Sequence, residues 1–201
     1  MKNTQDKNEI SINAQVDYFQ MELIQKFEQP NVKERLEVLN KINFLVIQQK
    51  WNLWSQLSDV LINGLKDNSQ LIIEKTIVLM KSLIQNKMTK KILMDQIFEV
   101  LLFKSSIQSK KSIIEDSLDI LNNVMPNVTE SQMLNLLKMG LNSQNGKIVE
   151  NSISLISNAI SLGNKLKVLI LKEIIPLINK VLEKGDDEVK KQGVIFIVNL
   201  T

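Results

Sequence analysis

Apolar residues recur along almost the whole chain at the three- and four-residue spacing that marks one face of an amphipathic helix. No stretch shows a convincing alternation of apolar and polar residues, the pattern typical of half-buried strands. Short polar turns such as Gln144-Asn145-Gly146 separate the periodic stretches. The pattern predicts helices over about 12–28, 33–48, 51–66, 70–86, 90–104, 110–125, 130–141, 147–162, 166–184 and 187–200. At the start of one of them, Thr129 and Gln132 predict a capping box.

Alternate helices repeat one pattern. Segments that begin at one equivalent position each carry an apolar residue seven positions later. The starts are Val32, Ile73, Ile114, Val149 and Val189, and the later residues are Leu39, Met80, Leu121, Ile156 and Phe196. The spacing of about 35 to 41 residues is typical of HEAT and armadillo helix pairs. One such pair cannot bury its apolar face alone, so neighbouring pairs must stack.

We therefore predict an all-α fold, an α-solenoid of about five HEAT-like helix pairs. An ordinary helical bundle is the alternative, and it explains less well why loop position, helix length and apolar register recur together. The domain prediction is a flexible N-terminal segment over 1–11 and a single HEAT-repeat domain over 12–201. The sequence leaves open whether the last repeat is truncated and whether 1–201 is a full protein or an excised domain.

The amino-acid composition limits the catalytic and metal-binding chemistry that the protein can perform. The 201 residues include no cysteine and no histidine, which excludes disulfides, zinc fingers, thiol nucleophiles and imidazole bases. The adjacent carboxylates Glu115 and Asp116 lie near a predicted helix start, where they offset the helix dipole. No glycine-rich phosphate loop is present in the sequence. We expect a binding protein, with no catalytic residue, cofactor or metal.

Charge and hydropathy limit the classes of partner that the protein can have. The 25 basic and 22 acidic residues leave a net charge of +3, which attracts an acidic partner only mildly. Nucleic-acid binding would require more positive charge with aromatic residues interleaved for stacking. No apolar run reaches the length of a membrane span, and the polar start of the chain lacks the core of a signal peptide. The sequence predicts a monomeric cytoplasmic protein with a protein partner.

Trp51 and Trp54 are the most conspicuous side chains, because tryptophan is enriched in binding hot spots. We expect them to begin a helix, with Leu57 and Leu61 continuing their apolar stripe. This position favours packing between the first two repeats over a second binding site.

Five segments combine a polar loop with the helix that follows it. In order they are NVKERLEVLNKI, KDNSQLIIEKTIVLMKSLI, SKKSIIEDSLDILNNV, MGLNSQNGKIVENSISLISNAI and LEKGDDEVKKQGVIFIVNL. They resemble the five tubulin-binding loops of TOG domains, the HEAT arrays of microtubule polymerases and CLASP-type proteins. In the first, Lys33, Arg35, Leu36 and Leu39 match the family pattern W-K-x-R-L-x-x-L.

The resemblance implies that a row of intra-repeat loops binds αβ-tubulin and contributes to microtubule regulation, which places the protein at the cytoskeleton. The residues that it implicates are Val32, Lys33, Arg35, Asn68, Ser69, Lys110, Lys111, Asn145, Lys147, Lys190 and Lys191. Val32 stands where the family usually presents an exposed tryptophan. This departure supports the alternative of a HEAT-repeat protein-protein interaction scaffold without tubulin affinity.

Overall fold

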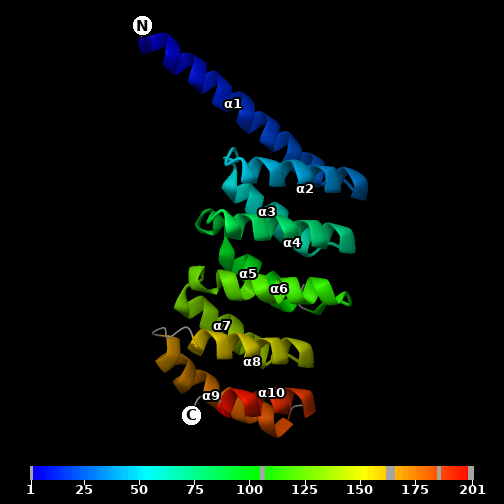
Figure 1. The fold of residues 1–201 in the computed structure, drawn as a ribbon, viewed down its shortest axis with the longest axis vertical. Coiled ribbons are helices and arrows are strands. Elements are labelled where there is room, and N and C mark those ends of the chain that lie inside the picture. The colour runs from blue at the N-terminus through cyan, green and yellow to red at the C-terminus, as the bar shows by residue number, and fades with distance from the viewer. Residues whose placement is uncertain (1, 105–106, 162–165, 185–186, 199–201) are drawn as a thin grey trace. The chain divides into compact units, whose positions relative to one another are not determined.

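The computed structural model describes residues 2–104, 107–161, 166–184 and 187–198, and within these ranges only helices, turns and loops occur (Figure 1). The helices are α1 (Lys2–Phe27), α2 (Val32–Ile47), α3 (Trp54–Leu65), α4 (Gln70–Gln85), the 3-10 helix η1 (Thr89–Lys91), α5 (Met94–Phe103), α6 (Lys111–Val124), the 3-10 helix η3 (Met125–Asn127), α7 (Glu130–Leu141), α8 (Gly146–Ser161), α9 (Leu166–Lys184) and α10 (Asp187–Val198). The chain divides into two compact units, Met1–Leu93 and Met94–Thr201.

The predicted helices are confirmed, and the first residue differs by more than one position in three of them. Helix α1 begins at Lys2, whereas the sequence predicted a flexible segment over 1–11. This segment carries no apolar stripe, but it also lacks glycine and proline, so the helix extends through it at a gain of one hydrogen bond per residue. Helix α3 begins at Trp54, after residues 51–53, which form no regular secondary structure, and α5 begins at Met94, after the η1 turn. The single domain over 12–201 stays a prediction.

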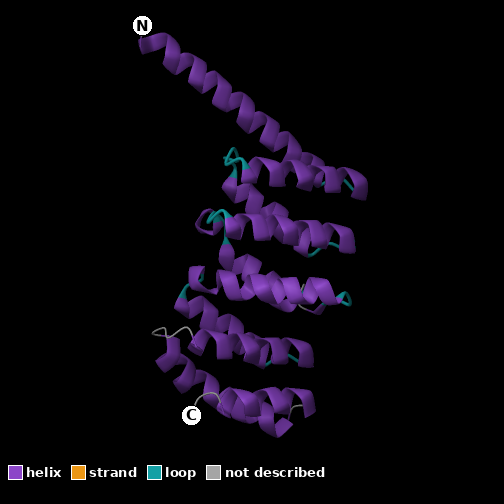
Figure 2. Cartoon of the chain, viewed as in Figure 1, coloured by secondary structure: helices purple, strands orange, loops and turns teal. Residues whose placement is uncertain are grey.

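Unit 1 contains α1 to α4, with α2 packed against both α1 and α4, and α3 packed against α4. The α2–α3 loop lies at one end of these helices and the α3–α4 loop at the other (Figure 2). In unit 2, α8 packs against α7, α9 and α10. The residues seven positions into the repeat pattern are at most 1% exposed in all five copies: Leu39, Met80, Leu121, Ile156 and Phe196. The repeat identified in the sequence is therefore a repeat of core positions.

A glycine brings two helices of a pair close together in each unit. A Cβ atom on Gly64 of α3 would lie 2.2 Å from Oγ1 of Thr76 in α4. A Cβ on Gly140 of α7 would lie 2.0 Å from Oγ of Ser152 in α8. Thr76 and Ser152 are both fully buried. The Thr76 hydroxyl donates to the Ile72 carbonyl at 2.8 Å, and the Ser152 hydroxyl likewise donates to a carbonyl of its own helix. The absence of a side chain at each glycine therefore permits the α3–α4 and α7–α8 contacts.

A buried glutamine ties α1 to the loop before α3. Gln20 is fully buried, and its Nε2 donates to the Lys50 carbonyl at 2.8 Å. Its Oε1 accepts from the backbone N–H groups of Asn52 at 2.9 Å and Leu53 at 3.3 Å. Trp51 in this loop is 2% exposed and donates its Nε1–H to the Leu53 carbonyl. Trp51 thus packs in the core, as predicted, but it lies before the helix instead of beginning it.

Candidate protein-binding loops

The loop before α2 presents an ordered lysine. Asn31 caps the helix, because its Oδ1 accepts from the backbone N–H groups of Lys33 at 3.0 Å and Glu34 at 3.4 Å. The Lys33 side chain is exposed at this fixed turn, while Val32 is half-buried as the first residue of α2. This loop therefore offers a cation but no large exposed apolar side chain at position 32.

An ion pair joins the start of α2 to the loop before α4. Arg35 pairs through Nη1 with Oδ2 of Asp67, and the two side chains are 17% and 11% exposed. The other oxygen of Asp67 accepts from the backbone N–H of Ser69 at 2.8 Å. Asn68 between them is exposed. Arg35, which the resemblance places at the partner surface, thus holds two loops together, and sequence reasoning missed this pairing because 32 residues separate the partners.

The loop before α6 ends in two exposed lysines. Lys110 occupies the N-cap position in an extended conformation, with φ of −83° and ψ of 117°. Lys111 lies 3.3 Å from the Glu115 carboxylate, but its side chain is 88% exposed. An ion pair this exposed is worth little, so the lysine remains available to another carboxylate.

The loop before α8 is built by short polar side chains. Oγ of Ser143 accepts from the Asn145 N–H at 3.1 Å, and Oδ1 of Asn145 accepts from the Lys147 N–H at 3.0 Å. Lys147 extends into solvent, with 68% of its side chain exposed and its Nζ 3.1 Å from Glu150. Asn145 therefore shapes the turn that carries Lys147. The resemblance implicates Asn145 as a partner contact, and in the structure it has a structural role.

The last pair of implicated residues lies early in α10, where Lys190 is half-buried and Lys191 is exposed. Residues 185 and 186 of the preceding loop, which belong to the fifth of the segments that resemble tubulin-binding loops, lie outside the described residues. The valine before the lysine pair, Val189, is 5% exposed and packs inward.

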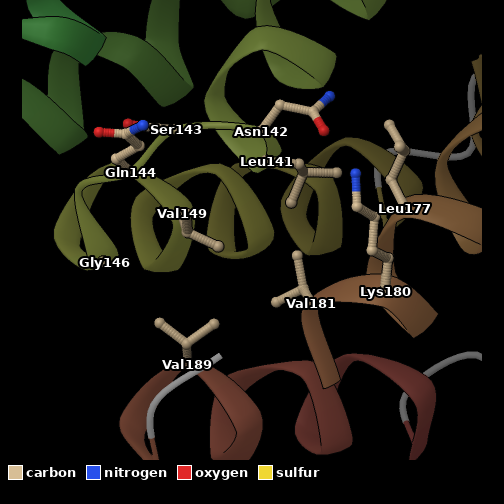
Figure 3. Close-up of a pocket in the computed structure, with 10 residues that line it drawn as sticks. All are labelled: Leu141, Asn142, Ser143, Gln144, Gly146, Val149, Leu177, Lys180, Val181 and Val189. Carbon is tan, nitrogen blue, oxygen red and sulfur yellow. The ribbon is translucent and has the colours of Figure 1, made fainter. Parts of the chain in front are cut away.

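Beside these segments, unit 2 contains an open groove of about 440 Å³ (Figure 3). It is lined by the α7–α8 loop and by residues of α9 and α10. The apolar lining residues are Leu141, Val149, Leu177, Val181 and Val189, and the polar ones include Asn142, Ser143, Gln144 and Lys180. Sequence reasoning missed Leu177, Lys180 and Val181, because their helical spacing marks a face of α9 without showing which loop that face meets.

The capping box is confirmed in one of its two halves. Oγ1 of Thr129 accepts from the Gln132 backbone N–H at 3.4 Å. The side-chain oxygen of Gln132, which would accept from the Thr129 backbone N–H in the other half, accepts from the Thr129 hydroxyl instead. Its Nε2 donates to Oδ2 of Asp95 in α5 at 2.6 Å. Across the described ranges, no group of three or more acidic side chains could hold a metal ion. None of the helices described is long and apolar enough to cross a membrane.

Solved structures show the same helical architecture. One belongs to a study of tubulin recruitment and assembly by microtubule polymerases with Tumor Overexpressed Gene (TOG) domain arrays, and it superposes with a TM-score of 0.73 at 18% sequence identity. Another, the N-terminal domain of MAST/Orbit, superposes with a TM-score of 0.71 at 14% identity over 89% of this chain and 81% of that one. The chain has a TOG-like fold.

The superposition on the polymerase structure covers 88% of this chain and 39% of the polymerase chain, so the chain described here spans about two fifths of the length of that polymerase chain. A designed armadillo repeat protein superposes with a TM-score of 0.50 at 19% identity, over 89% of this chain and 80% of its own. No protein-family model and no curated protein matches the sequence. The α-solenoid predicted from the helical repeat is thus confirmed, and it is of the TOG-like type.

Proposed function

We propose that this chain is a non-enzymatic TOG-like domain that binds αβ-tubulin through the loops that precede α2, α4, α6, α8 and α10. The observation that carries the proposal is the TOG-like fold, shared with a polymerase structure described by its tubulin recruitment. The activity belongs to microtubule regulation in the cytoplasm, and it requires no cofactor.

The chemistry of the loops supports this function. Exposed lysines stand in or just after all five loops: Lys33, Lys66, Lys110, Lys111, Lys147 and Lys191. Helix caps and turns fix the backbone at Lys33 and Lys147, so these lysines are presented to a partner from a defined backbone conformation. Lysines of this kind increase the rate of encounter with an acidic surface and help to set its orientation. Arg35 acts as a positioning residue that links two of the loops through Asp67.

Gel filtration with purified, unpolymerised αβ-tubulin tests the proposal. We expect a 1:1 complex at low salt that weakens as the ionic strength rises, because exposed charges are screened. Lys33→Glu and the double variant Lys190→Ala with Lys191→Ala are expected to reduce co-elution. Lys90→Glu is the matched control, since Lys90 is exposed in η1, beyond the end of α4 opposite to Ser69. Failure of the unmodified chain to co-elute with tubulin at low salt would refute the function.

Val32 favours a second candidate, a HEAT-type scaffold that holds another protein. The residue is half-buried, so the first loop lacks the exposed tryptophan of the family pattern. Co-elution of tubulin with Val32→Trp but not with the unmodified chain would favour this scaffold, and binding by the unmodified chain would eliminate it.

A further inference from the structure

The groove in unit 2 combines a buried apolar floor with an open mouth. Leu141, Val149 and Val189 line it while being only 4%, 6% and 5% exposed. Val181 is 9% exposed, and Leu177 beside it is half-buried. An apolar side chain that covered this floor would remove further apolar surface from water, which is the main favourable contribution to most protein associations.

A lysine stands at the rim of the groove. Among the described residues that line the groove, Lys180 is the only charged one, and Figure 3 shows its ammonium group turned toward Leu141 and Asn142. Lys111, Lys138 and Lys147 each have a carboxylate within 4 Å in unit 2. Within the part of the chain that the structure describes, Lys180 has no such carboxylate. Its charge is therefore available to a carboxylate supplied from outside.

The opposite rim offers hydrogen bonds. The exposed Asn142 and Gln144 belong to the α7–α8 loop, whose turn is held by the bond from the Asn145 N–H to Ser143 Oγ. The Nδ2 of Asn142 donates to the Lys138 carbonyl at 2.9 Å, which leaves its Oδ1 and the amide of Gln144 for a ligand. A loop that presents these amide groups on one side, with a lysine on the other, suits a polypeptide better than an apolar small molecule. A polypeptide presents backbone donors and acceptors beside its side chains, and such groups must be paired when they are buried.

We propose that this groove receives a protruding segment of the bound protein, which lays an apolar side chain over Leu177 and Val181 and places a neighbouring carboxylate at Lys180. The inference rests on the proposed function, so the segment belongs to tubulin. It adds an apolar contact to an interface otherwise described by exposed lysines. In such interfaces a few side chains that pack into desolvated pockets carry most of the binding energy.

Charge reversal on α9 tests the carboxylate contact. We expect Lys180→Glu to weaken the affinity for purified αβ-tubulin about tenfold, since the variant replaces an attraction with a repulsion. Lys172→Glu is the matched control, because Lys172 is exposed on the same helix and does not line the groove. The apolar contact is tested in the same way by Leu177→Ser, with the half-buried Ile175→Ser as its control.

A fluorescent label tests occupancy of the groove without removing any contact. Because the chain has no cysteine, Gln144→Cys gives a single site for a solvent-sensitive fluorophore at the rim. Ser131→Cys is the control, exposed at the end of α7 away from the groove. We expect added tubulin to shift the emission of the label at position 144 to shorter wavelength and to leave the label at position 131 unchanged.

The outcomes separate this inference from the function on which it rests. If the unmodified chain does not bind tubulin, both are overturned. If it binds and loses affinity with Lys33→Glu, but Lys180→Glu and Leu177→Ser bind as tightly as their controls and the label at position 144 does not shift, the groove is not part of the interface. In that case the proposed function stands.

Discussion

Replacing Gln20 is expected to loosen the contact between α1 and the loop before α3. The amide of Gln20 makes three hydrogen bonds to the backbone of this loop, at 2.8, 2.9 and 3.3 Å, and it is fully buried. Gln20→Leu keeps a side chain of similar size and removes all three bonds. The Lys50 carbonyl and the N–H groups of Asn52 and Leu53 then lose their partner.

The size of the effect follows from these bonds. A typical intramolecular hydrogen bond contributes about 1 kcal/mol net, so the loss of three lowers the free energy of unfolding by about 3 kcal/mol. A domain is stable by about 5–15 kcal/mol, so this is a large share of the total. For a chain of this size each kcal/mol corresponds to about 2–4 °C, and the melting temperature should fall by about 6–12 °C.

Urea unfolding followed by tryptophan fluorescence measures the change, because Trp51 is buried in the affected loop. Amide hydrogen exchange is the second observable, and we expect faster exchange at Asn52 and Leu53. Gln25→Leu is the matched control, since Gln25 is exposed on the same helix and its replacement should change stability by less than about 0.5 kcal/mol. A loss below about 1 kcal/mol for Gln20→Leu, with unchanged exchange in the loop, would refute the reasoning.

Two other sites yield predictions of the same kind. Gly140→Ala places a methyl group 2.0 Å from Oγ of Ser152, and we expect the free energy of unfolding, measured with urea, to fall by about 1–3 kcal/mol. Adding Ser152→Ala should restore most of this loss, and no recovery would contradict the proposed clash. On α1, the hydrogen bond that Lys26 donates at 2.6 Å lowers the pKa of the Glu22 carboxyl. The small contribution of this pair to stability is therefore present above the pKa that the carboxyl has in the unfolded chain, and it is lost as the pH falls through the pKa in the folded chain. A carboxyl titration followed by NMR should show the pKa of Glu22 rising in Lys26→Met, and an unchanged value would contradict the pairing.

The helices could be predicted because their information is local. The residues seven positions into each repeat, such as Leu39 and Phe196, mark the buried face in the sequence and are buried in the structure. The predicted helix starts are wrong where the local sequence pattern does not mark the boundary. The first residues of α1 have no apolar stripe. Trp51 is apolar, as residues on the buried face of a helix are, but it lies in a loop that Gln20 holds through hydrogen bonds.

The candidate site could be predicted only in outline. The loops and their lysines follow from the repeat, and Lys33 and Lys147 are indeed exposed there. The pairing of Arg35 with Asp67 did not follow, because either residue alone is an ordinary charged side chain of a helix start or a turn. The groove beside Lys180 was missed for the same reason, since its walls come from four helices and the α7–α8 loop.

The sequence by itself determined that the protein is helical, where most of the helices end, and that they recur in pairs with one buried register. These properties depend on residues three or four positions apart, which every helix brings together. Only the tertiary structure decided that Gln20 clamps a loop, that Arg35 joins two loops, and that Lys180 stands over an apolar floor. Each of these depends on groups about 30 or more residues apart, such as Gln20 and Lys50, that meet only after the helices have packed.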